Sequence, residues 1–209
     1  MKRSFVFFWP ALLAGALCLC SCLGSSAEII LQAGGGGRLK LEYRVSRQFQ
    51  NIGALDGNAR WPSVPAGRAD FERSVDSLEG LRLISFSAGE EGPDLLYRAE
   101  IGFSALEDIL PLLDYGGEAA SLVRGERRSL VLRLGPGPET ADPGLLALAE
   151  EAFRGYHIAL SLISPSPVEL RVRGGDSLRI EQEGGKAGFS VPLYDLILLP
   201  GPVTAEFVF

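Results

Sequence analysis

Apolar and polar residues alternate most regularly between residues 38 and 49. A period of two residues is typical of a β-strand whose two faces meet different surroundings. The pattern therefore predicts a sheet with one buried face and one face in water. The apolar face would carry Leu39, Leu41, Tyr43 and Val45, and the wet face Lys40, Glu42, Arg44 and Ser46.

Shorter stretches of the same kind predict further strands, and apolar residues at helical spacing predict helices. We expect helices over residues 68–78, 104–113 and 142–153, the second starting with the capping box Ser104-Ala105-Leu106-Glu107. The chain is therefore expected to have an α+β fold, with a mostly antiparallel sheet and about three helices. The expected strands cover residues 28–33, 81–87, 95–103, 118–123, 129–134, 157–163, 168–173, 177–182, 187–191 and 203–209.

The middle of the chain has a recognisable order of elements. Residues 39–134 give strand, helix, strand, strand, helix, strand, with an added hairpin strand. This order matches the split β-α-β, or ferredoxin-like, arrangement. The run Gly135-Pro136-Gly137-Pro138 follows it, which places a possible internal boundary near residues 135–141.

The first 27 residues have the pattern of a bacterial export signal. Lys2 and Arg3 precede an apolar run over residues 5–19, and small residues follow. This segment resembles a lipoprotein signal peptide, in which a cysteine thiol is acylated, for example with palmitate, and becomes the new N-terminus. The resemblance implies a bacterial lipoprotein that is exported and lipid-anchored to the cell envelope.

Three cysteines compete for the lipid, and all of them lie in this segment. A lipoprotein cleavage box has a branched apolar residue three positions before the cysteine and small residues just before it. Leu19 and Ser21 fit these positions for Cys22, whereas bulky leucines directly precede Cys18 and Cys20. The resemblance therefore implies that Cys22 is the lipid attachment site. Residues 1–21 would be the signal peptide, 22–27 a short tether and 28–209 the folded domain.

Two plainer interpretations of the N-terminus stay open. Ser25-Ser26-Ala27 resembles the small-x-small site of ordinary signal peptidase, which would release a protein without a lipid. The apolar run could also stay as a membrane anchor, although it is short for a bilayer span and contains Pro10.

Charge limits the partners of the mature domain. Cleavage removes Lys2 and Arg3 but no acid, so the formal net charge of −6 becomes −8. An acidic surface gives no electrostatic footprint for nucleic acid, and an anionic bilayer would repel it. We therefore expect membrane attachment through the lipid and no nucleic-acid partner.

Candidate catalytic residues are few. Gly175-Asp176-Ser177-Leu178 matches a short string found in a family of serine esterases, whose histidine lies downstream of the serine. The only histidine here, His157, lies upstream, so we interpret the string as a hairpin turn. One histidine and no free thiol cannot build an ordinary zinc site. The sequence thus predicts no catalytic residue, no metal and no cofactor.

One loop residue is a candidate contact. Trp61 lies in a segment that also contains Pro62 and Val64. An exposed tryptophan on a loop often contacts a partner or a ligand, and the other possibility is that Trp61 folds back over the core.

The leading prediction is a non-enzymatic envelope lipoprotein that binds or scaffolds an unknown envelope protein. A carrier of a lipid or other apolar ligand is the alternative, with a cavity lined by Phe71, Leu106 and Ile109. The early amphipathic strand, the ferredoxin-like middle and the closing segment at residues 189–193 resemble lipoproteins of the LppM type, which implies lipid or glycolipid binding. A hydrolase without histidine or cysteine is the third possibility.

Overall fold

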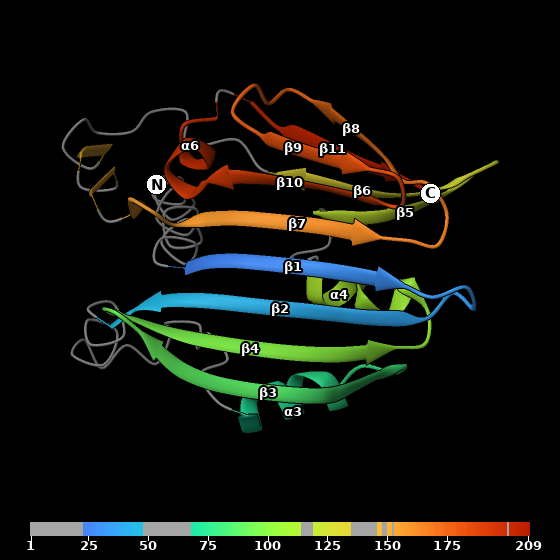
Figure 1. Cartoon of the computed structure of the whole chain (residues 1–209), viewed down its shortest axis with the longest axis horizontal. Helices are drawn as coiled ribbons and strands as arrows, with labels where there is room; N and C mark the ends of the chain where they lie inside the picture. Colours follow the sequence, from blue (N-terminus) through green and yellow to red (C-terminus); the bar gives the residue numbers. More distant parts are fainter. Residues whose placement is uncertain are drawn as a thin grey trace, which may run out of the picture.

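A computed structural model describes residues 23–47, 68–113, 119–134, 146–147, 150–151, 153–199 and 201–209. The described chain forms a seven-stranded and a four-stranded sheet, with helices packed against the larger one (Figure 1). Neighbouring strands are antiparallel except β1 and β7, which are parallel. The predicted α+β fold with a mostly antiparallel sheet is confirmed.

The seven-stranded sheet has β1 at its centre. Its order is β3 (Leu81–Glu91), β4 (Asp94–Phe103), β2 (Gly37–Ser46), β1 (Leu23–Leu31), β7 (His157–Ile163), β10 (Lys186–Pro192) and β9 (Arg179–Glu183). The four-stranded sheet has the order β5 (Ala120–Arg124), β6 (Arg128–Leu134), β11 (Val203–Val208) and β8 (Glu169–Arg173). Strands from both sides of residues 135–141 therefore share one sheet.

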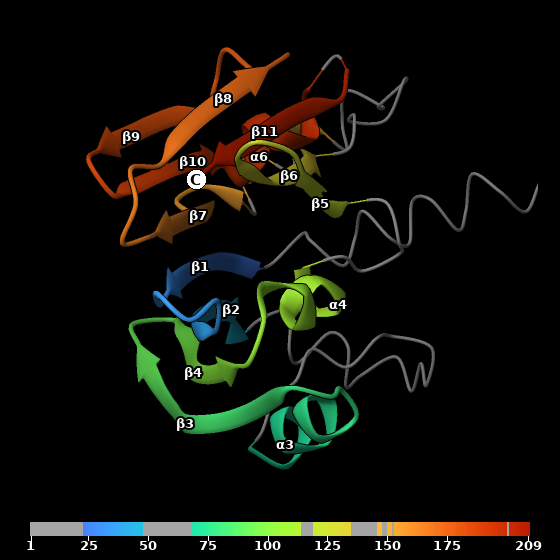
Figure 2. The same ribbon diagram turned by 90° about the vertical axis from the view of Figure 1, so that its right-hand side faces the viewer.

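The helices and the smaller sheet cover the same face of the larger sheet. Helix α3 (Arg68–Asp76) lies behind β3, and the 3₁₀ helix η1 (Leu106–Ile109) continues into α4 (Leu110–Leu113) behind β1 and β2 (Figure 1). Helix α6 (Leu193–Ile197) follows β10. The end-on view shows α3, α4 and the four-stranded sheet on one side of the seven strands (Figure 2).

The core fills the space between these layers, and the alternation predicted for β2 decides which residues enter it. Leu39 is fully buried, as are Ile29 on β1 and Ile101 on β4. The two sheets meet through Phe189 and Phe207, whose ring centroids are 6.2 Å apart. The opposite face of the larger sheet is left open by every described element (Figure 2).

The ferredoxin-like prediction for residues 39–134 is not confirmed. Strand β4 does lie between β2 and β3, which gives the first half of that arrangement. The fourth strand should then pair beside β2, but β1 occupies that position and β5 belongs to the four-stranded sheet. The N-terminal strand therefore displaces β5 from the sheet.

Three local predictions were also wrong. The tether expected over residues 22–27 is strand from Leu23 onward, because β1 pairs with β2 from Leu23 opposite Val45. The cap of η1 is Ala105 and not Ser104, since Asp108 accepts a hydrogen bond of 2.8 Å from the Ala105 amide. The segment 174–178 is not a hairpin turn, because β8 and β9 belong to different sheets.

Candidate ligand-binding trough

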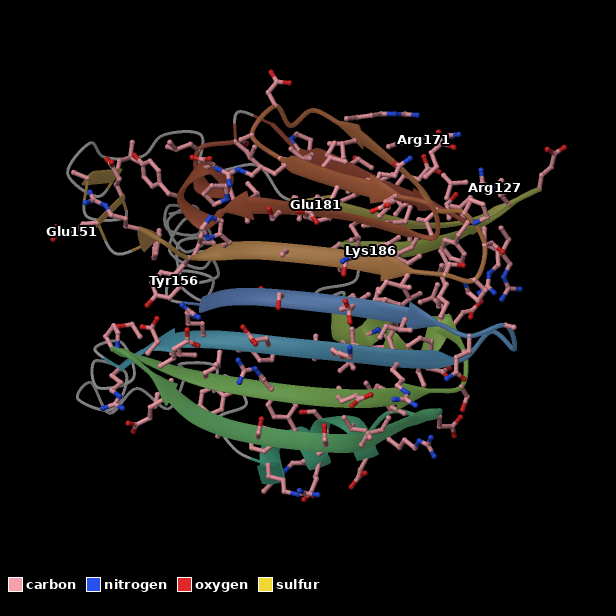
Figure 3. All side chains as sticks on the ribbon, viewed as in Figure 1. Arg127, Glu151, Tyr156, Arg171, Glu181 and Lys186 are labelled. Atoms are coloured by element: carbon pink, nitrogen blue, oxygen red, sulfur yellow. The ribbon has the colours of Figure 1, made fainter. Side chains whose placement is uncertain are left out.

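The open face of the seven-stranded sheet is where polar side chains gather (Figure 3). It is built by the strand positions that alternate with the core positions. Its centre is a groove of about 670 Å³, to which all seven strands contribute. We call this groove the trough. Its polar lining residues are Ser26, Glu28, Lys40, Glu42, Ser85, Ser87, Arg98, Glu100, Ser161, Arg179, Glu181, Lys186 and Ser190.

Small residues on three neighbouring strands, β1, β7 and β10, form the floor of the trough. Strand register aligns Ser26 on β1 with Ala159 on β7, and Ala159 with Ser190 on β10. One step along the strands, Ser161 lies opposite Gly188. The hollow exists because these side chains are short while those of the flanking strands are long. Three hydroxyl groups in the floor can each donate and accept a hydrogen bond.

One wall of the trough, on β1, β2 and β4, consists of ion pairs. Lys40 Nζ donates to Glu28 Oε1 at 2.8 Å, and Arg98 Nε donates to Glu42 Oε2 at 2.7 Å. Arg38 binds Glu100 at 3.1 Å beside them. The hydrogen bond to Glu28 raises the pKa of the Lys40 ammonium group above its ordinary value. The charges of this paired wall thus already have protein partners.

The other wall, on β9 and β10, is different. It carries Lys186, Glu181 and Arg179, all exposed (Figure 3 labels the first two). No ion pair joins any of these three side chains to another residue of the described chain. We call it the free wall, because its two cations and one carboxylate remain available to a ligand.

Tyr156 lies across the face beyond the trough, at the end where β1 begins. Its hydroxyl donates a hydrogen bond of 2.8 Å to Asp94 Oδ1, and Asp94 is only 7 % exposed. Gly24 makes room for the ring, since a Cβ there would lie 3.2 Å from Tyr156 Cδ1. This contact joins the start of β7 to the start of β4 across β1 and β2.

A second charged cluster lies at the far end of the molecule, around the β5–β6 hairpin. Glu107 on η1 binds Arg124 at 2.7 Å and Arg128 at 3.5 Å. The hydrogen bond from Arg124 lowers the pKa of Glu107 below its ordinary value. These contacts fasten the hairpin to η1, so we assign the cluster a structural role.

Arg127 and Arg171 flank Glu169 in the same region (Figure 3). Arg171 is the closer of the two at 2.8 Å, and its hydrogen bond lowers the pKa of Glu169. Both arginines thus share one carboxylate on the surface of the four-stranded sheet. This grouping also ties strand β8 to the β5–β6 hairpin.

The two residues singled out from the sequence, Cys22 and Trp61, lie outside the described residues, as does the possible boundary near 135–141. His157 is exposed at the start of β7, with Nδ1 3.1 Å from the Gly155 carbonyl oxygen. Sequence reasoning missed the trough. The sequence does show short residues at the open-face positions of β1, β7 and β10. They indicate a groove only once these three strands are known to be neighbours in the sheet.

The positions expected to line an internal cavity are packed with side chains. Phe71 contacts Tyr43 and Phe86 at centroid distances of 6.0 and 5.2 Å. Leu106 and Ile109 are fully buried in the main core cluster. These three residues therefore belong to the core that supports the sheet from behind.

Over the described ranges, no helix is long and apolar enough to cross a membrane. Within the same ranges, no group of three or more histidine, cysteine, aspartate or glutamate side chains could hold a metal ion. No protein-family model and no curated protein sequence matches the chain.

Proposed function

We propose that the chain is a lipid-anchored lipoprotein of the bacterial envelope, and that its domain is a non-enzymatic binding module. The ligand would occupy the trough on the open face. One observation carries the proposal: a groove of about 670 Å³ combines a hydroxyl floor with charged groups that have no partner in the described chain. Its volume falls within the range of about 300–1,000 Å³ that is common for ligand sites.

The start of β1 supports a close attachment to the membrane. Cys22, the predicted acylated residue, directly precedes Leu23, and Leu23 already pairs with Val45 of β2. An acyl group on Cys22 would therefore be joined to the central strand of the sheet without a flexible linker. Several acyl chains hold a protein stably on a membrane, whereas one chain holds it weakly.

The state of the carboxylates favours binding over acid–base catalysis. A general acid or base needs a pKa near the working pH, which burial or a like charge usually provides. In the trough, Glu28, Glu42 and Glu100 each accept a hydrogen bond from a cationic side chain. These carboxylates are thus engaged in ion pairs, which suits a surface that recognises a ligand.

Palmitate labelling tests the anchor. Cells that produce the wild-type chain or Cys22→Ser are grown with radiolabelled palmitate, and label and membrane retention are compared. We expect both to be lost in the variant. Label that persists in Cys22→Ser would contradict the assigned site, and no label in either protein would contradict the lipoprotein assignment.

Site-specific photocrosslinking in intact cells tests the trough. A photoreactive amino acid replaces Ser161 or Ser190 in the floor, and Val123 on β5 serves as the exposed control. We expect adducts from the two floor positions and none from the control. Equal adducts at all three positions, or none at any, would show that the trough is not the binding site.

A further inference from the structure

We infer that the outer edge of strand β3 pairs with the same edge of a second copy of this chain. The two seven-stranded sheets would join in antiparallel orientation about a two-fold axis. This inference goes beyond the proposed function, because it concerns an interface between chains and does not depend on what the trough binds. It follows from the length, charge and exposure of β3.

The edge of β3 differs from the other sheet edges in length and charge. Strands β5, β8 and β9 form the other edges and have five residues each, whereas β3 has eleven. Residues 83–89 of β3 carry no charge, while three of the five residues are charged in both β8 and β9. Short strands and charges usually protect a free edge from pairing, so the long uncharged edge of β3 is the one that favours another strand.

The outer edge of β3 is accessible. Residues 84, 85 and 87–89 are all exposed, and the apolar side chain of Ile84 is among them. Strand β4 pairs with the inner side of β3, and no strand of the described chain pairs with the outer side. Figure 1 shows β3 as the lowest strand of the sheet, with α3 behind it. Helix α3 packs on the core face, where Phe71 contacts Phe86.

The backbone of β3 directs free hydrogen-bonding groups to this edge. The turn to β4 has two residues, 92–93, so Glu91 closes the hairpin. In an antiparallel ladder the residues of one strand bond alternately to its two sides. Counted back from Glu91, Phe86 and Ala88 direct their amide and carbonyl groups to the outer edge. Two copies that meet about Ser87 can exchange these bonds, Phe86 of each with Ala88 of the other.

The charges at the two ends of this segment favour a second copy in antiparallel orientation. Arg82 precedes the uncharged residues, and Glu90 and Glu91 follow them. Arg82 is exposed and forms no ion pair within the described chain. With Ser87 on the axis, the extra residue at the β-bulge, Ile84, brings Arg82 opposite Glu91 of the second copy. Parallel pairing would instead bring like charges together, which is destabilising.

The trough supports the same pairing. Ser85 and Ser87 are its lining residues on β3, and both side chains are short. In the joined sheets these serines would lie beside those of the second copy, between the two paired walls. Each trough would then continue across the axis onto residues of the other chain.

The paired edge predicts a weak dimer. Stable complexes bury about 1,200–2,000 Å² in total, which is more than the pairing of two short segments provides. We therefore expect a reversible association, and a covalent trap is the suitable measurement.

The test uses the full chain in intact cells, produced as two copies that carry different affinity tags. A photoreactive amino acid replaces Ser85, and Ile180, exposed on β9 at the opposite edge of the same sheet, is the matched control. We expect Ser85 to give an adduct of twice the mass of the chain that carries both tags, and Ile180 to give none. No adduct from Ser85, an adduct with another protein, or a crosslink within one chain would overturn the inference.

Proline at an outward amide sharpens this test. Ala88→Pro removes a donor that bonds only across the proposed interface, so the adduct from Ser85 should fall at least about tenfold. Ile180→Pro is the matched control, because the two-residue turn between β9 and β10 also directs the Ile180 amide to a free edge. Ser87→Glu should lower the adduct as well, since it brings two carboxylates together at the axis, and it decides the matter if urea unfolding shows that Ala88→Pro is not folded. An undiminished adduct in the folded variants would overturn the inference.

A charge exchange tests the antiparallel orientation. Arg82→Glu or Glu91→Arg in both copies should lower the adduct about threefold, because like charges then meet at both ends. One copy with Arg82→Glu and the other with Glu91→Arg should restore it, since both ends again join opposite charges. A mixed pair that gives no more adduct than either variant alone would refute this pairing.

Discussion

The two faces of the seven-stranded sheet are built from the same strands but have different roles. On β10, Phe189 points into the core and is 4 % exposed, while its neighbour Ser190 lines the trough. The core face gains stability from apolar surface removed from water. The open face holds hydrogen-bonding groups and charges that contribute little to stability at the surface. Substitutions at neighbouring residues of one strand should therefore change the stability of the fold and the recognition of a ligand separately.

The largest difference is expected between Phe189→Ala and Ser190→Ala. Removing the Phe189 ring empties space beside Phe207 and should lower the free energy of unfolding by about 3–5 kcal/mol. Ser190→Ala should change it by less than about 0.5 kcal/mol. Urea unfolding of both variants measures the contrast. Similar losses in the two proteins would mean that the faces are not independent.

Gly37 and Gly89 give the next largest expected difference in stability. A Cβ on Gly37, on the core face of β2, would overlap the Ile30 carbonyl oxygen and the Phe103 ring. Gly37→Ala should therefore cost about 1–3 kcal/mol through overpacking. Gly89 on β3 is the control, since a Cβ there meets nothing within 4 Å. Thermal unfolding would refute this account if Gly89→Ala were the more damaging change.

Tyr156 tests whether one polar contact also stabilises the open face. Tyr156→Phe removes the hydroxyl that donates to the buried Asp94 carboxylate, and should cost about 1–2 kcal/mol. Tyr194→Phe, on α6, is the control. Urea unfolding at pH 7 measures both, and a neutral effect of Tyr156→Phe would show that another donor satisfies Asp94.

The smallest effect is expected at Glu107, which belongs to neither face. The folded-state pKa of Glu107 is lowered by Arg124, so its contribution is present above the unfolded value of about 4.5 and is lost as pH falls through the lower folded value. Because the pair is exposed, Glu107→Gln should cost only about 0.5 kcal/mol at pH 7. Unfolding measured at a series of falling pH values checks this, because the difference between the two proteins should shrink as Glu107 becomes protonated. A difference that does not change with pH would exclude the ionic origin.

The sequence predicts what depends on local pattern. The expected strand at 157–163 is confirmed as β7 without any shift, because its alternation and its flanking turn are local features. The assignment of β8 and β9 to one hairpin was wrong because each strand finds its partner elsewhere, in β11 and β10. Local pattern does not say which sheet a strand joins.

The trough could not be predicted for the same reason. Ser26 and Ser161 belong to strands that are far apart in sequence, and they share a floor only because β1 pairs in parallel with β7. The charges on β2 were predicted to face water, but their pairing with Glu28 and Glu100 depends on which strands flank β2. The asymmetry between the walls is therefore a property of the assembled sheet.

The central place of β1 also has a kinetic consequence. Ser25, near the start of β1, pairs with Ile158, so the seven-stranded sheet cannot be completed until β7 is in place. Such long-range pairing is slow because the entropy of a large loop must be lost first. During folding, one edge of β1 should stay unpaired for longer than any hairpin of the chain. A shortened chain that begins at Glu28 would lose the first half of this strand, and we expect it to misfold instead of giving a smaller soluble domain.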